Sequence, residues 1–183
     1  MILALWIVIG IVVVIALYII FTFNRLIILK YRVENAWSQI DVQLKRRYEL
    51  IPNLIATVKG YMKHEKGVLT EVTKMRANLV SGSMNEKAKA SDAISNAFKT
   101  IFAVAEDYPK LKASENFKML QEELSGTESK IAYARQFYND NVMELNNSIQ
   151  QFPSRIIAGM LNYKEREFFK TQESEKKSVK VEF

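Results

Sequence analysis

The chain contains no cysteine, one histidine, three prolines and six glycines among 183 residues. The absence of cysteine excludes disulfides and thiolate metal sites, and it fits a reducing compartment. Little proline and glycine, together with abundant Ala, Leu, Lys, Glu, Gln and Asn, favours helix almost throughout. The chain also lacks a Ser/His/Asp order, a G-x-S-x-G motif and a glycine-rich phosphate loop. We therefore predict an all-α protein without a cofactor or metal site, and no residue is nominated as a catalyst.

Charge is missing from the beginning of the chain, because no charged side chain occurs from Ile2 to Phe23. About 20 apolar residues in a helix cross the ~30 Å hydrocarbon core of a bilayer. The stretch is too long for the apolar region of a signal peptide, and it has no basic segment before it or small-residue cleavage site after it. We predict that residues 1–23 are an uncleaved transmembrane anchor, which makes the lipid bilayer a partner.

Basic residues are also absent before this stretch, whereas Arg25, Lys30 and Arg32 follow it closely. Because Lys and Arg near a span favour the cytoplasmic side, we predict the N-terminus outside and residues 24 onward in the cytoplasm. The formal net charge is +6, but acidic residues are interspersed with the basic ones. We interpret this as a solvated surface beside anionic lipid and predict no nucleic-acid binding.

A stripe of core-type residues with steps of three and four runs from Leu26 to Tyr61. This is a heptad pattern, typical of helices that pack side by side at small crossing angles. Lys30 and Arg47 interrupt the stripe. Its phase is kept across Pro52, which favours a kinked continuous helix over a break at this proline.

Further helices are predicted over about residues 68–80, 84–106 and 115–152, with a brief helical turn at 156–161. Ser83 and Glu86 have the spacing of a capping box at the start of the second of these. The sequence therefore predicts an N-terminal transmembrane helix that continues into a long antiparallel four-helix bundle at residues 24–163. A charged tail, residues 164–183, follows it.

The polar side of the first helix carries more amides than a soluble surface needs. One interpretation is a solvated face with some hydrogen bonds between helices. The other is a surface for self-association, in which amides hydrogen-bond across subunits. The candidate self-association residues are Asn35, Trp37, Gln39 and Gln43, and the expected product is a homo-oligomer with closed cyclic symmetry.

Two other segments have a functional and a simpler interpretation. His64 beside Glu65 lacks the second histidine of an H-E-x-x-H zinc motif, so we interpret the pair as part of a polar turn. The last five residues alternate apolar and polar side chains, which is typical of a strand. Val179, Val181 and Phe183 are a candidate partner-binding tail that adds a strand to a partner's sheet; the alternative is a disordered tail.

Several blocks of the chain resemble the signature of a known family. They include Val33-Glu34-Asn35-Ala36-Trp37-Ser38-Gln39-Ile40-Asp41-Val42-Gln43-Leu44-Lys45-Arg46-Arg47, Leu50-Ile51-Pro52-Asn53-Leu54, Thr57-Val58-Lys59-Gly60-Tyr61 and Tyr108-Pro109-Lys110-Leu111-Lys112-Ala113-Ser114-Glu115-Asn116-Phe117. Together with shorter matches as far as Phe152-Pro153, they resemble the LemA family over nearly the whole chain. The resemblance implies a single-span bacterial inner-membrane protein with a cytoplasmic bundle of long helices. It also implies genes that often neighbour membrane zinc metallopeptidases of the HtpX type.

From these observations we expect a membrane-anchored scaffold or adaptor that self-associates and is not an enzyme. The competing interpretation is a regulator or partner of a membrane protease, or an enzyme whose site the sequence does not reveal. The sequence separates these classes poorly, because a scaffold and a noncatalytic regulator look alike.

Overall fold

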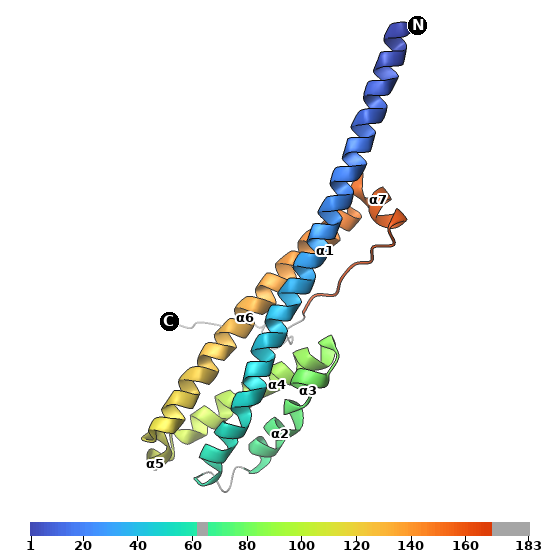
Figure 1. Cartoon of the computed structure of the whole chain (residues 1–183). Helices are drawn as coiled ribbons and strands as arrows, with labels where there is room; N and C mark the ends of the chain where they lie inside the picture. The colour runs from blue at the N-terminus through green and yellow to red at the C-terminus, as the bar shows by residue number, and fades with distance from the viewer. Residues whose placement is uncertain (62–65, 170–183) are drawn as a thin grey trace, which may run out of the picture. The chain divides into compact units, whose positions relative to one another are not determined.

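The computed structural model describes residues 1–61 and 66–169, which form seven α-helices and their connections (Figure 1). The helices are α1 (Ile2–Lys59), α2 (Lys66–Arg76), α3 (Asn78–Ser81), α4 (Met84–Ala105), α5 (Pro109–Lys112), α6 (Glu115–Gln150) and α7 (Ser154–Met160). No strand occurs in these two ranges, and the predicted all-α class is confirmed. The turn with His64 and Glu65 lies outside the described residues, as do Val179, Val181 and Phe183.

The chain forms two compact units. The first consists of residues 1–37 and 137–168, and the second consists of residues 38–136 with Phe169. Both α1 and α6 contribute residues to both units, so neither unit is a continuous stretch of chain.

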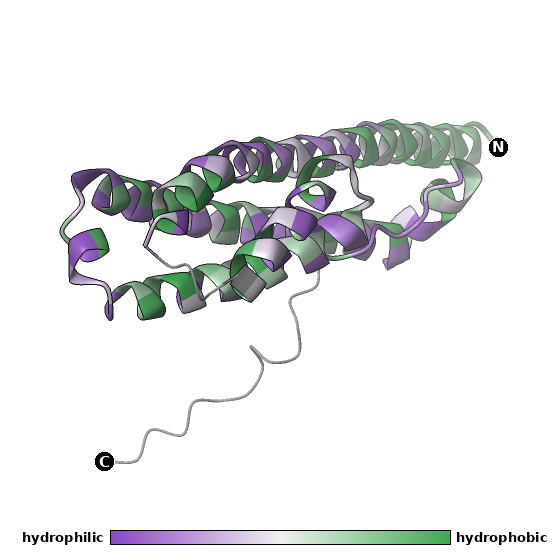
Figure 2. Ribbon diagram, turned by 90° about the horizontal axis from the view of Figure 1, so that it is seen from below, coloured by the Kyte–Doolittle hydropathy of each residue, from purple (hydrophilic) through white to green (hydrophobic). Residues whose placement is uncertain are grey.

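In the first unit, the N-terminal part of α1 is an exposed apolar helix. Residues 2–21 are all exposed, and Figure 2 shows this length of α1 as continuously hydrophobic. It belongs to the one helix, among the described residues, that is long and apolar enough to cross a membrane. Burial begins at Thr22, where residues of the same unit first cover α1.

The buried stripe of this part of α1 differs in detail from the predicted one. The buried apolar residues are Leu26, Leu29, Val33 and Ala36, spaced by three and four. The predicted stripe instead passes through Lys30, as an interruption, and Trp37. Both of these residues are half-buried, and their neighbours Leu29 and Ala36 face the core. The difference arises because heptad spacing alone does not decide which of two neighbouring residues faces the core. That depends on the helices packed against α1.

The second unit is a four-helix arrangement of α1, the α2–α3 pair, α4 and α6. Its core is contributed by apolar residues at heptad spacing: Ile40, Leu44, Ile51, Leu54 and Val58 of α1, Ile94, Phe98 and Ile101 of α4, and Phe117, Leu124 and Ile131 of α6. Burying such stripes against one another is the main source of stability for amphipathic helices that are marginal alone. The predicted bundle is therefore observed in this unit.

Two of the predicted helix boundaries need correction. The helix expected over residues 68–80 is divided at Ala77 into α2 and α3, although Ala77 keeps helical dihedral angles (φ −60°, ψ −38°). The interruption therefore lies in the hydrogen bonding and not in the direction of the chain. Pro109, expected only to end a helix, also begins α5 at its first position, where the missing N–H costs nothing.

The predicted capping box at the start of α4 is confirmed. The backbone N–H of Ser83 donates to Glu86 Oε2 over 2.8 Å, and the N–H of Glu86 donates to Ser83 Oγ over 3.4 Å. The Ser83 hydroxyl also donates to Glu86 Oε2 over 2.7 Å, and this hydrogen bond, together with the one from the Ser83 N–H, lowers the pKa of the Glu86 carboxyl below its usual value. The cap thus favours the charged form of Glu86, which also suits the N-terminal end of a helix.

Pro52 lies inside α1, and the helix is continuous through it as predicted. A proline has no N–H, so the carbonyl four residues earlier, that of Tyr48, loses its helical partner. In the structure, Arg76 Nε of α2 donates to the Tyr48 carbonyl over 2.9 Å. The Arg76 guanidinium also stacks on the Tyr48 ring at 3.7 Å from its centroid. The proline therefore leaves an acceptor on α1 that docks α2.

We expect Arg76→Met to loosen α2 without unfolding the unit, because it removes the bond to Tyr48 and keeps most of the apolar stem. Loss of a charged hydrogen bond costs about 1–2 kcal/mol, which corresponds to roughly tenfold faster amide exchange in α2. Hydrogen exchange measured by mass spectrometry checks this. Lys74→Met is the matched control, since Lys74 is exposed on the same helix; equal exchange in the two variants would contradict the docking role.

Candidate functional site

The four residues predicted for self-association do not form one equivalent set. Asn35 and Gln39 are exposed on α1. Trp37 is half-buried and packs edge-on against Tyr138 of α6, with ring centroids 5.5 Å apart and an interplanar angle of 65°. Such an aromatic contact stabilises the first unit itself. Trp37 is therefore a packing residue within the chain, whereas Asn35 and Gln39 stay accessible.

Gln43 is less accessible than expected of a self-association residue, whereas its neighbour Val42 is exposed. Gln43 is half-buried, and its Oε1 atom is buried without a hydrogen-bond partner among the described residues. Val42 lies three residues after Gln39 on the accessible side of α1, and it is 62% exposed. This apolar side chain and the exposed amide one helical turn before it are both accessible to a partner. We name Gln39 and Val42 the α1 patch.

The second unit contains a buried charge network centred on Arg47, which the sequence analysis does not predict. The Arg47 side chain is only 1% exposed and forms an ion pair with Glu128 of α6. Its Nη1 donates to the carbonyl and the Oγ of Ser91 of α4, over 2.9 and 2.8 Å. Ser95 Oγ donates to Glu128 Oε2 over 2.6 Å and so closes the network. Three helices are thereby joined through one guanidinium.

A second ion pair lies seven residues, or about two helical turns, further along α6. Arg135 Nη2 is 2.8 Å from Asp92 Oδ1 of α4, and both side chains are largely buried. The Arg135 guanidinium also lies over the ring of Phe169, 4.5 Å from its centroid. Phe169 is buried, so this cation–π contact holds the last described residue of the chain on the bundle.

The electrostatics of Arg47 suit a structural role. Burial lowers its pKa to about 10, and the negative charge of Glu128 opposes this shift. The guanidinium therefore remains charged at neutral pH and requires its counter-ion. Buried charges that must pair with particular partners fix the alignment of helices more than they add stability. The network thus aligns α1, α4 and α6 with one another.

The first unit contains an extended segment, residues 162–168, that we name the strap. It follows α7, whose end is closed by Asn162 in the left-handed conformation (φ 54°). The N–H groups of Asn162 and Tyr163 donate to the Gly159 and Ala158 carbonyls over 3.1 and 3.0 Å. This is a Schellman motif with asparagine at the position usually taken by glycine.

Amide and phenol groups of α6 hold the strap. Buried Asn146 exchanges two hydrogen bonds with the Arg166 backbone, both of 2.9 Å, and the Tyr138 hydroxyl donates to the Glu167 carbonyl over 3.0 Å. Burial raises the pKa of the Tyr138 phenol, so it stays protonated and able to donate. At least one of the amides on this helix therefore serves the chain's own fold.

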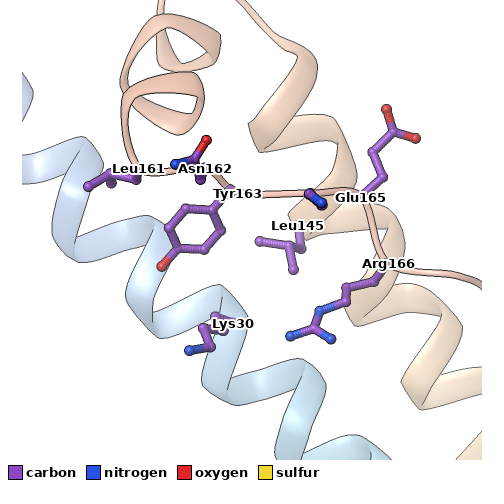
Figure 3. A pocket seen from close by; sticks show the side chains of 8 residues that line it. Lys30, Leu145, Leu161, Asn162, Tyr163, Glu165 and Arg166 are labelled. Atoms are coloured by element: carbon purple, nitrogen blue, oxygen red, sulfur yellow. The ribbon is translucent and has the colours of Figure 1, made fainter.

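An open hollow of about 540 Å³ lies between α1, α6 and the strap (Figure 3). It is lined by Lys30, Leu145, Leu161, Asn162, Tyr163, Lys164, Glu165 and Arg166. Figure 3 shows Tyr163 and Arg166 pointing toward α1, while Glu165 points away. Arg166 also lies 3.9 Å from Glu34 of α1. The lining of the hollow therefore includes three basic side chains, Lys30, Lys164 and Arg166, and the last of these is paired with Glu34.

Comparison with known proteins identifies the family. The model of the LemA family matches residues 36–183. The chain belongs to the LemA family. A curated relative, Protein LemA of Metamycoplasma hominis, is 26% identical over 161 residues, which cover 85% of this chain and 72% of that protein. Family membership and the exposed apolar helix together fit a membrane-anchored helical protein.

The range matched by the LemA family includes the described residues of the second unit and leaves out the whole apolar segment, residues 2–23. It contains both buried ion pairs and the strap. Among residues 1–61 and 66–169, no three His, Cys, Asp or Glu side chains gather as they would around a metal ion. The features described in this LemA family protein are therefore of two kinds: contacts that join its helices, and side chains exposed on its surface.

Proposed function

We propose that the chain is a scaffold or adaptor of the bacterial inner membrane, one that associates with further copies of itself and has no catalytic activity of its own. The observation that carries the proposal is the α1 patch. Val42 is apolar, exposed and set on a helix whose other side is fully packed. Exposed apolar residues beside amides on a rigid helix favour a protein partner over solvent.

The continuity of α1 supports a role at a membrane. One helix of 58 residues contains both the apolar segment and the α1 patch. Copies confined to one bilayer meet at high effective concentration, so a small contact on each copy is sufficient for assembly. The small residues of the apolar segment, Ala4, Gly10, Ala16 and Thr22, are six positions apart, so no two of them have the small-xxx-small spacing that draws spans together. The contact should therefore lie in the bundle.

The mass of the detergent-solubilised particle tests this function. We expect a protein mass that is an integral multiple, two or larger, of the 21.1 kDa chain, measured by light scattering with the detergent subtracted. A particle that contains one chain at membrane-like protein density would contradict self-association. A single chain in stoichiometric complex with a membrane protease would favour the regulator interpretation instead.

The proposed topology places residues 24 onward in the cytoplasm, because Arg25, Lys30 and Arg32 closely follow the apolar segment. The chain has no cysteine, so single cysteines report their own position. We expect Met119→Cys, at an exposed site of α6, to resist a membrane-impermeant maleimide in intact cells and to react fully after permeabilisation. Ile2→Cys is the matched control and should react in both. Labelling at position 119 in intact cells would contradict the proposed topology and place residues 24 onward outside the cytoplasm.

A further inference from the structure

The short helix α7 presents an apolar face away from the protein. Phe152, Ile156 and Met160 are 83%, 57% and 80% exposed. Ile156 and Met160 are four residues apart in α7 and share one side of that helix, and Phe152 lies in the turn that precedes it. The opposite side is anchored, because Ile157 and Ala158 are buried. The protein thus holds three large apolar side chains outward in a fixed orientation.

The position of α7 in the first unit places this face near the end of the apolar segment of α1. Leu161, which ends α7, lines the same hollow as Lys30 (Figure 3). Lys30 follows Phe23 by seven residues, which is about 10 Å along a helix. Burial of α1 begins at Thr22, so the covering residues of this unit reach the last turn of the apolar segment. The exposed face of α7 therefore lies close to where α1 leaves the apolar region.

Basic groups accompany this face. Arg155 precedes Ile156 on α7 and is exposed, and Arg25 is exposed at the end of the apolar segment. The carboxylate of Glu144 lies 3.9 Å from Arg25, and that of Glu165 lines a second hollow together with Arg155. Apolar residues flanked by arginine are the composition of helices that lie in the interface of a bilayer.

We propose that α7 and the preceding Phe152 are a second membrane contact, in which the Phe152, Ile156 and Met160 side chains enter the interface of the bilayer that α1 spans. This proposal rests on the membrane-spanning placement of residues 2–23 in the proposed function. Lipid is favoured over a second copy because α7 lies beside α1 near the end of the apolar segment (Figure 1). Three side chains also offer less area than the ~800 Å² per partner of a stable protein interface. Contact at two points fixes the rotation of the protein on the membrane.

The test uses the full chain with one fluorescent label, reconstituted in vesicles whose lipids carry a nitroxide quencher near the glycerol. Met160→Cys places the label on α7, and Met119→Cys is the matched control, an exposed methionine of α6 replaced in the same way. Phe23→Cys, at the end of the apolar segment, is the membrane reference. We expect the Met160 label to lose about half of its fluorescence and the Met119 label almost none, because interfacial helices sit at the depth of this quencher.

Each outcome decides one point. Equal, weak quenching at positions 160 and 119, with strong quenching at 23, overturns the α7 contact and leaves the proposed span intact. Weak quenching at 23 as well would show that the span itself is wrong. A label at 160 that shifts to shorter wavelength without lipid quenching, and loses that shift on dilution of the protein in lipid, would assign the face to a second copy and overturn the proposal.

Discussion

Replacing Glu128 by alanine is expected to destabilise the second unit by about 3 kcal/mol, whereas Glu123→Ala costs less than about 1 kcal/mol. Both glutamates lie on α6, and each pairs with one of two adjacent arginines of α1. Glu123 accepts two hydrogen bonds of 2.8 and 2.7 Å from Arg46 at the surface. Glu128 pairs with Arg47, which is buried. The comparison therefore varies burial while the chemistry of the pair stays the same.

The difference arises because removing Glu128 leaves a charged guanidinium in the core. Arg47 keeps its neutral contacts with Ser91 and Ser95, but these do not balance its charge. Glu128 itself is 31% exposed. The opposite deletion should therefore be milder: in Arg47→Met, the remaining carboxylate can turn toward water, and methionine fills much of the vacated volume.

Unfolding by guanidinium in detergent, followed by the helical circular dichroism signal, measures these free energies. Adding Arg47→Met to Glu128→Ala should recover most of the loss, because the double variant no longer buries an unpaired charge. Similar costs for Glu128→Ala and Glu123→Ala, or no recovery in the double variant, would show that the buried network has no special energetic role.

Much of the fold could be predicted from local pattern. The continuity of α1 through Pro52, the Ser83 capping box and the heptad stripe from Ile40 to Val58 all depend on residues within a few positions of one another, and the structure confirms them. Tyr61, at the end of the predicted stripe, is exposed. The family was also correctly recognised from blocks of sequence. Local spacing, however, leaves open which of two neighbouring residues faces the core, and so Leu29 and Ala36 were missed as core residues.

The buried network could not be predicted in the same way. Arg47 was visible as a charge at a core position, and this is a signal that a buried acid must face it. Its partner Glu128 is 81 positions away in the chain, and nothing local distinguishes it from the exposed Glu123. The strap is a similar case, since the role of Asn146 depends on the backbone of Arg166. Pairings between distant segments require the packed helices themselves.

The charged substitution Val42→Asp is expected to dissociate the proposed oligomer, while Val80→Asp should leave it intact. Val42 is 62% exposed on α1 and Val80 is 46% exposed on α3, so both aspartates are hydrated in a single chain and both variants should fold. If Val42 lies in a subunit interface, assembly buries an unpaired carboxylate. A penalty of about 3 kcal/mol raises the dissociation constant roughly 100-fold.

Gln39→Ala should act in the same direction but more weakly, because it removes only hydrogen bonds that water replaces in the separated chains. The particle mass of each variant, measured over a range of protein concentrations in detergent, checks the order Val42→Asp, then Gln39→Ala, then Val80→Asp. An unchanged oligomer in Val42→Asp would place the interface away from the α1 patch. Dissociation by Val80→Asp to the same extent would instead indicate general charge repulsion, because Val80 is also an exposed valine but lies on a different helix.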